Sequence, residues 1–230
     1  MDNWLDAADA VAERANGERV SVRRLFDAGR FSQRLLEFAP GRSRAPSEES
    51  ADEVLYVLEG EGTLELGGAT HPLAPGVAVY VPRGFTSTLE TAAGVTLLSV
   101  LVHEPVGGEA RPEVVDVADT NAQNATAGRQ FALGACCESA TQFVGYIPVG
   151  RAPEHFHTYD EVVYVLQGEG LLHIGGETAP LRPGACVHLP ARLVHCLENT
   201  GPGEMHVLGV FRPAGSPAEA YYPDGTRAIY

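Results

Sequence analysis

A long internal repeat constrains the fold of this 230-residue chain more than any other feature. The segment EVLYVLEGEGTLELGGATHPLAPGVAVYVPRG, which begins at Glu53, matches EVVYVLQGEGLLHIGGETAPLRPGACVHLPAR, which begins at Glu161, at roughly half of its positions. Upstream, QRLLEFAPG ending at Gly41 is similar to QFVGYIPVG ending at Gly150. A chain that repeats one unit in this way is built from two similar modules, and its length is sufficient for two cores.

Both copies have the pattern of β-structure. Short runs rich in Val, Leu and Tyr are broken by Gly and Pro at regular intervals, which is typical of strands joined by tight turns. The expected fold class is therefore all-β. A short N-terminal helix is the one helix expected, and it would end at Asn16-Gly17. Its apolar residues recur at helical spacing: Trp4, Leu5, Ala8, Val11 and Ala12.

The second copy carries a group of side chains that bind metals in other proteins. His155 and His157 are two residues apart, so both side chains lie on one face of an extended strand. Glu161 follows four residues later, and His195 follows a turn at Pro190. Because imidazole and carboxylate groups are ligands for divalent transition metals, this segment is a candidate metal site.

The spacing of these residues resembles that of the cupin superfamily. The first motif of the family is glycine, a short spacer, His-x-His, three or four residues, glutamate, six residues and glycine. It matches the segment from Gly150 to Gly168, with a spacer one residue short. Arg192 stands where the second motif usually has glycine, but the other positions of that motif match Gly184, Pro190, His195 and Asn199.

This resemblance implies a bicupin, that is, two tandem cupin jelly-roll β-barrels. We expect an N-terminal barrel over residues 1–108 and a C-terminal barrel over residues 109–230. It also implies one divalent transition metal ion, Fe, Mn, Ni, Zn or Cu, whose ligands would be His155, His157, Glu161 and His195.

The first copy lacks most of these ligands. At the positions of the three histidines it has Ser47, Glu49 and Ser87, and of the four candidate ligands it keeps only Glu53. A single carboxylate is a poor site for a transition metal. The metal is therefore expected only in the C-terminal barrel.

Further side chains are candidates for the cavity around the metal. Glu161 is a catalytic candidate because a carboxylate also accepts protons, and His173 is a second one. His173 would face the cavity if the turn before it has three residues, whereas a two-residue turn would reverse its direction. Phe143 and Tyr146 are candidate substrate contacts, and the apolar lining is expected to come from Val163, Val165, Val187 and Leu189.

The segment after Phe211 contains too much Pro and Gly for a core strand. We expect it to pack across a barrel, with Tyr221 and Tyr222 as anchors.

The resemblance allows three functions. The leading expectation is a metal-dependent enzyme for a small organic molecule, an oxygenase similar to the quercetin dioxygenase type. The second is non-redox chemistry at the same site, by an isomerase, cyclase, decarboxylase or aminohydrolase. The third is a small-ligand or sugar binding protein whose metal fixes the ligand. The fold alone does not choose between these.

Charge limits the partners that the chain can have. The net charge is −14, which disfavours binding to nucleic acid. No apolar run is long enough for a membrane span or a signal peptide, so we expect no membrane partner and a cytoplasmic location. A homodimer through edge strands is compatible with the pattern.

Overall fold

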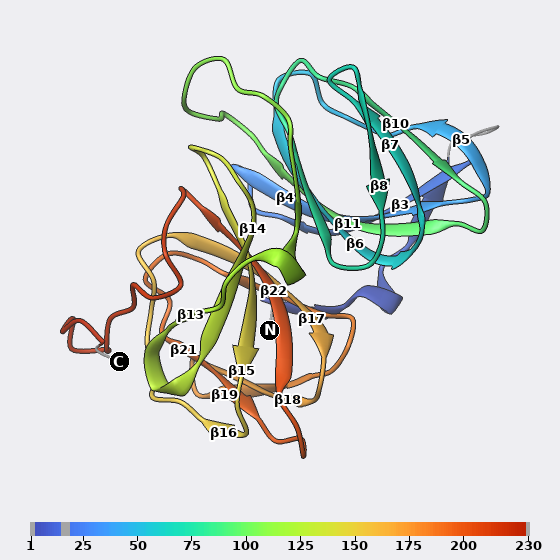
Figure 1. Ribbon diagram of the computed structural model, residues 1–230. Helices are drawn as coiled ribbons and strands as arrows, with labels where there is room; N and C mark the ends of the chain where they lie inside the picture. The colour runs from blue at the N-terminus through green and yellow to red at the C-terminus, as the bar shows by residue number, and fades with distance from the viewer. Residues whose placement is uncertain (1–2, 15–18, 229–230) are drawn as a thin grey trace. The chain divides into compact units, whose positions relative to one another are not determined.

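The computed structural model describes residues 3–14 and 19–228, and it divides the chain into two compact units (Figure 1). We call them the N-terminal and C-terminal barrels and describe each by itself. The N-terminal barrel consists of Ala8–Asp119 and Gly134–Ser139. The C-terminal barrel consists of Met1–Ala7, Thr120–Leu133 and Ala140–Tyr230.

The N-terminal barrel is built from two antiparallel sheets. The first has seven strands in the order β12 (Glu113–Asp116), β9 (Val77–Val81), β6 (Asp52–Gly60), β11 (Val95–Val102), β4 (Phe31–Phe38), β3 (Val20–Asp27) and β2 (Ala12–Arg14). The second has four strands in the order β5 (Gly41–Arg44), β10 (Ser87–Thr91), β7 (Gly62–Leu66) and β8 (Ala69–Leu73).

The C-terminal barrel repeats this arrangement. Its seven-stranded sheet has the order β1 (Trp4–Asp6), β20 (Ala185–Leu189), β17 (Asp160–Gln167), β22 (Met205–Arg212), β15 (Thr141–Ile147), β14 (Gln130–Cys136) and β13 (Gln123–Asn124). Its four-stranded sheet has the order β16 (Gly150–Arg151), β21 (His195–Asn199), β18 (Gly170–Ile174) and β19 (Glu177–Leu181). The prediction of an all-β fold with two similar modules is confirmed.

Burial along the strands explains why these segments pair as they do. The small sheets alternate: in β7 Leu64 and Leu66 are buried and Glu65 between them is exposed, as expected for a sheet with one face in water. In contrast, all of β9 is buried. Each barrel has its own apolar core, to which both of its sheets contribute. These cores hold the two sheets of a barrel face to face.

The expected N-terminal helix is wrong. Trp4–Asp6 forms strand β1, which pairs with β20, and a 3-10 turn at Ala7–Asp9 and the strand β2 follow. The indole of Trp4 packs against the C-terminal core and its Nε1–H donates to the carbonyl of Pro180 at 2.8 Å. Pairing at a sheet edge and partial burial of the indole outweigh a helical spacing of apolar residues. Asn16-Gly17 lies outside the described residues.

The strand β1 has a counterpart in the other barrel. β12 pairs with β9 at the edge of the first seven-stranded sheet, as β1 pairs with β20 at the edge of the second. The remaining helical segments of the described residues are two 3-10 turns, Val117–Asp119 and Thr126–Gly128. No helix in the described part of the chain has the length and hydrophobicity needed to cross a bilayer.

Candidate metal centre

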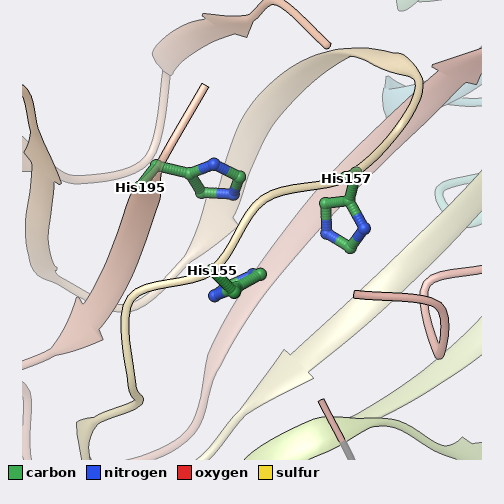
Figure 2. Close-up of side chains that lie close together, drawn as sticks. All are labelled: His155, His157 and His195. Carbon is green, nitrogen blue, oxygen red and sulfur yellow. The ribbon is translucent and has the colours of Figure 1, made fainter. Parts of the chain in front are cut away.

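Backbone pairing brings two of the candidate histidines directly opposite each other. His155 and His195 form an antiparallel bridge, in which each N–H donates to the carbonyl of the other at 3.0 and 2.9 Å. Directly opposite residues project to the same face of a sheet. His157, two residues along the same extended segment, projects to that face as well. Figure 2 shows the three rings turned toward one another.

The three imidazoles form one buried cluster. Their side chains offer ligand atoms that all lie within 4.8 Å of one another. Each ring directs its Nδ1 at a backbone carbonyl: His155 at Pro153 (3.1 Å), His157 at Glu219 (2.7 Å) and His195 at Leu193 (2.8 Å). Because a carbonyl only accepts, each Nδ1 carries the hydrogen, and Nε2 keeps its lone pair.

Burial keeps these rings neutral. It lowers the pKa of His155 to about 3, with help from the neighbouring His157. The pKa of His195 lies well below its ordinary value because of burial and of the two adjacent imidazoles. Burial also lowers the pKa of His157, partly opposed by the Glu219 carbonyl. Neutral imidazole is the form that binds a metal ion.

Glu161 lies on β17 and lines the same cavity, but it is not part of the cluster of ligand atoms found among the described residues. Its side chain is buried, and burial raises the pKa of its carboxyl to about 8 against the opposing effect of Arg129. A carboxyl that is neutral near pH 7 can donate or accept a proton there. Its role as a ligand stays a prediction.

The cavity around these four residues has a free volume of ≈ 60 Å³. Phe143 lies in its wall as expected, whereas Tyr146 does not line it and stacks edge-on against His206 instead. The four residues expected as apolar lining pack in the barrel core. The apolar wall comes instead from Phe131, Phe143, Ile147, Leu197, Val207, Phe211 and Pro217.

The sequence left the direction of the His173 side chain open, and His173 is not among the residues that line the cavity. Its strand, β18, lies in the four-stranded sheet, whereas β17 lies in the seven-stranded one, and only Gly168 and Glu169 separate the two strands. His173 therefore cannot share a face with Glu161 by cross-strand pairing. It lies between the buried Leu172 and Ile174, and its Nε2 is 2.7 Å from a carboxylate oxygen of Glu198.

Two features of the site escaped the sequence patterns. One is Arg129, which precedes β14 and lines the cavity. The other is the carbonyl of Glu219, in the C-terminal tail, which accepts a hydrogen bond from Nδ1 of His157. The tail does pack across its barrel: Tyr221 pairs with Phe156 through backbone hydrogen bonds, and their rings stack at 5.6 Å. The Glu219 carboxylate accepts hydrogen bonds from Tyr159 and Tyr221 at 3.0 and 2.9 Å.

The donor set fits a divalent transition metal ion. His155, His157 and His195 would hold it through Nε2, because each Nδ1 is already committed to a carbonyl. Carbonyl partners of this kind fix the ring orientation in metal sites. Three imidazole donors with a nearby carboxyl suit most first-row ions, so the donor set alone does not choose the metal.

Comparison with known proteins agrees with this fold. The family model for the cupin domain matches residues 34–98 and 142–211, one match in each barrel and more than half of the chain together. The chain belongs to the cupin superfamily. With both barrels matched, it is a bicupin, as the sequence resemblance predicted.

Individual relatives of this bicupin are distant. It is 31% identical over 104 residues to the polyketide synthase CurC of Streptomyces cyaneus, a match that covers 43% of this chain and 68% of that protein. It is 33% identical over 76 residues to L-ectoine synthase of Aliivibrio fischeri, covering 33% of this chain and 59% of that protein. A protein from Pseudomonas aeruginosa described as glyoxylate-induced has a similar fold, with a TM-score of 0.79 and 20% identity over 91% of this chain and 89% of that one.

Proposed function

We propose that this bicupin is a metal-dependent enzyme that acts on a small organic molecule in the cavity of its C-terminal barrel. The orientation of the three buried imidazoles carries the proposal, because each turns its Nδ1 to a carbonyl and keeps Nε2 as a donor. Three protein donors leave coordination positions for a substrate, which distinguishes a catalytic site from a closed structural one. A bound ion would act as a Lewis acid on the substrate.

The residues around the cluster have separate parts in this proposal. The carboxyl of Glu161, with a pKa of about 8, holds or releases a proton in the neutral range, where general acid–base catalysis is efficient. The apolar wall, which includes Phe143 and Phe211, keeps water out and strengthens electrostatic interactions inside. His173 has no part, because its ring is engaged with Glu198 away from the cavity.

We favour non-oxidative chemistry, such as ring closure, isomerisation, decarboxylation or amine hydrolysis. The support is the names of the two sequence relatives, a polyketide synthase and L-ectoine synthase, neither of which is an oxygenase. The second candidate is the oxygenase expected from the sequence, which the same open coordination positions would also serve. Oxygen uptake distinguishes them: metal-loaded protein that converts a substrate without consuming oxygen supports the first, and oxygen-dependent turnover supports the second.

Metal content of protein purified without added metal is the direct test. We expect about one divalent ion per chain in the wild type. We expect His155→Ala to weaken metal binding by more than ~100-fold, since loss of a ligand should exceed the effect of losing a ligand's partner. His71→Ala, in β8 of the N-terminal barrel, is the matched control and should bind metal as the wild type does. Wild-type protein that holds no ion after exposure to Fe, Mn, Ni, Zn and Cu would contradict the proposal.

Glu161→Gln tests whether the site catalyses or only binds. The change keeps the shape of the side chain but removes the group that exchanges a proton. For an enzyme we expect most of the metal affinity to remain and turnover to disappear. A wild type without detectable turnover, together with equal ligand affinity in wild type and variant, would favour the alternative of a small-ligand or sugar binding protein.

A further inference from the structure

Arg129 reaches the cavity from a tight turn between β13 and β14. The turn is closed by hydrogen bonds from Ala125 N–H to the Arg129 carbonyl at 2.9 Å and from Arg129 N–H to the Thr126 carbonyl at 3.3 Å. Ala127 and Gly128 both adopt left-handed conformations, with φ of 57° and 72°. Ala127 is thus held in a conformation that residues with a side chain seldom adopt. The turn delivers the long side chain of Arg129 to the wall of the cavity.

The guanidinium is fixed at one end. Its Nη2 donates to the carbonyl of Leu197 at 2.6 Å. This partner leaves other donors, because a guanidinium carries five N–H groups in a planar fork. Burial lowers the pKa of Arg129 from its ordinary value, but an arginine stays protonated in proteins.

The positive charge of Arg129 is not balanced by an ion pair. Within residues 3–14 and 19–228, no carboxylate lies within 4.0 Å of its nitrogens. Glu161 is the one carboxyl among the residues that line the cavity, and it forms no such ion pair with Arg129. A charge in an apolar cavity is costly unless it is paired. The cavity therefore favours a ligand that brings a negative charge.

We propose that Arg129 binds the carboxylate of a small organic acid, and that such an acid is the substrate class of this cavity. The proposal rests on the proposed function for the identity of the ligand as substrate, but not for its binding. A planar fork and a planar carboxylate form two parallel hydrogen bonds. The free volume of ≈ 60 Å³ corresponds to a few water molecules, so the acid has only a few atoms beyond its carboxylate.

Binding of acetate, propionate and malonate, measured by calorimetry at pH 7, tests the proposal. The metal-free protein is measured first, so that binding by an ion does not contribute. We expect Arg129→Gln to weaken binding of the acids at least ten-fold. Acetamide, which has the shape of acetate without its charge, should bind weakly to both proteins. The matched control is Arg151→Gln, whose guanidinium pairs with Glu154 at 3.5 Å, and it should bind the acids like the wild type.

Several outcomes would overturn the proposal. They are a wild type that binds none of the acids, equal affinities in wild type and Arg129→Gln, or displacement of acetate by phosphate at similar concentrations, which would indicate a general anion site. If Arg129→Gln does not fold, Arg129→Lys keeps the charge but loses the fork. A several-fold weaker affinity at an unchanged melting temperature then supports the proposal, and an unchanged affinity overturns it.

The metal content of the same variants separates this proposal from the proposed function. Arg129→Gln should hold as much metal as the wild type, because its side chain is not among the three imidazole donors. A wild type without metal that still binds acetate through Arg129 would contradict the enzyme and leave the carboxylate site standing. A wild type that is loaded with metal but binds none of the three acids would contradict the carboxylate site and leave the proposed enzyme standing.

Discussion

The two barrels share one architecture, but the equivalent buried glutamates, Glu53 and Glu161, have different surroundings. In the N-terminal barrel Glu53 pairs with the guanidinium of Arg34 at 3.0 Å and also accepts a hydrogen bond from Ser99. In the C-terminal barrel Glu161 occupies the equivalent place on β17, and no ion pair of the described residues includes it. One barrel thus pairs its glutamate internally, whereas in the other barrel the glutamate lines a cavity.

Strand registers show which residues of the two barrels are equivalent around this glutamate. Arg34 lies opposite Ser99 in the pairing of β4 with β11, and Phe143 lies opposite Gly209 in the pairing of β15 with β22. An arginine and a serine in one barrel therefore correspond to a phenylalanine and a glycine in the other. The first pair fills the interior with hydrogen bonds to the carboxylate, whereas the second leaves an apolar wall beside it.

Other positions are common to both barrels and belong to the fold. Asp52 accepts a hydrogen bond from the Arg83 N–H at 2.9 Å, and Asp160 accepts one from the Ala191 N–H at 2.9 Å. These bonds hold the turns that follow the equivalent strands β9 and β20. In contrast, the arginines that precede β3 and β14 differ: Arg19 donates to the Pro40 carbonyl, whereas Arg129 lines the cavity. The two barrels therefore differ by a few exchanged side chains on a common fold.

The largest effect on stability is expected from breaking the internal pair of the N-terminal barrel. Glu53→Leu would leave the buried guanidinium of Arg34 without its carboxylate, which should lower the free energy of unfolding by about 3–5 kcal/mol. The double variant with Arg34→Met should recover most of this loss, because the charge is then gone as well. Urea denaturation measures both.

The control for this pair is Glu65→Gln, which removes an exposed partner of Arg42 and should leave the urea midpoint unchanged. Metal content should be the same in all these variants, since the pair and the three histidines lie in different barrels. A Glu53→Leu protein as stable as the wild type would show that Glu53 and Arg34 do not depend on each other.

A second set of variants gives the C-terminal barrel the residues that the N-terminal barrel has at the equivalent positions. A Cβ at Gly209 would lie 2.3 Å from the ring of Phe143, so Gly209→Ser should displace the ring and cost about 2 kcal/mol. Adding Phe143→Arg removes the clash and supplies a guanidinium beside Glu161, so the double variant should be more stable than the single one. Thermal unfolding compares them. Gly203→Ser is the control, because nothing lies within 4 Å of its Cβ position. A double variant less stable than Gly209→Ser would refute the correspondence.

The repeat and the turn residues made most of the fold predictable. Strand alternation, glycines and prolines are local signals, and both barrels carry them. The prediction of an N-terminal helix was wrong because Trp4 and Leu5 pair with β20, which is far away in the sequence. Likewise, the segment Gly134–Ser139 lies with the N-terminal barrel although its neighbours on both sides belong to the other. Such exchanges depend on tertiary packing, which spacing does not encode.

The site was predictable where spacing and pairing agree. His155, His157 and His195 come together because an alternating strand and a bridge place them on one face. The direction of His173 could not be fixed in this way, because it depended on the turn before β18, and β17 and β18 belong to different sheets. Arg129 gave no signal, since a long side chain that enters from a turn has no characteristic spacing.

The unpaired state of Glu161 predicts an unusual pH dependence for the metal-free protein. Its pKa is about 8 in the folded chain and near its ordinary value when unfolded, so at pH 6.5 only the folded state holds this proton. Raising the pH therefore removes stability until the folded carboxyl ionises. The difference in unfolding free energy between wild type and Glu161→Gln should fall by about 1.5 kcal/mol from pH 6.5 to 8.

The comparison with Glu161→Gln is needed because the three histidines also make the stability of the wild type depend on pH. Their pKa values are lowered, so the unfolded state binds more protons below pH 6.5 and stability rises as the pH increases through that range. This rise has the opposite sign to the effect of Glu161, but it is common to both proteins and cancels. A difference that stays constant between pH 6.5 and 8 would show that Glu161 is ionised in the folded protein, as a paired carboxylate would be.

The smallest expected effect concerns the path of the chain beyond the strands β11 and β22. After β11 the chain returns to its own sheet edge as β12, whereas after β22 it crosses to His157 and is held by Tyr159, whose hydroxyl bonds the Glu219 carboxylate. Burial raises the pKa of Tyr159 to about 12, so this hydroxyl remains a donor at all working pH values. Tyr159→Phe should cost about 1 kcal/mol for the lost hydrogen bond.

The same variant should weaken metal binding by roughly ten-fold, because a looser Glu219 carbonyl no longer fixes the ring of His157. Competition with a chromophoric chelator measures this, and Tyr222→Phe, one residue beyond Tyr221 in the same tail, is the matched control. Equal metal affinity in Tyr159→Phe and wild type would mean that the tail only covers the cavity. The orientation of His157 would then come from its own strand, as it does for His155, whose Nδ1 is held by Pro153 two residues away.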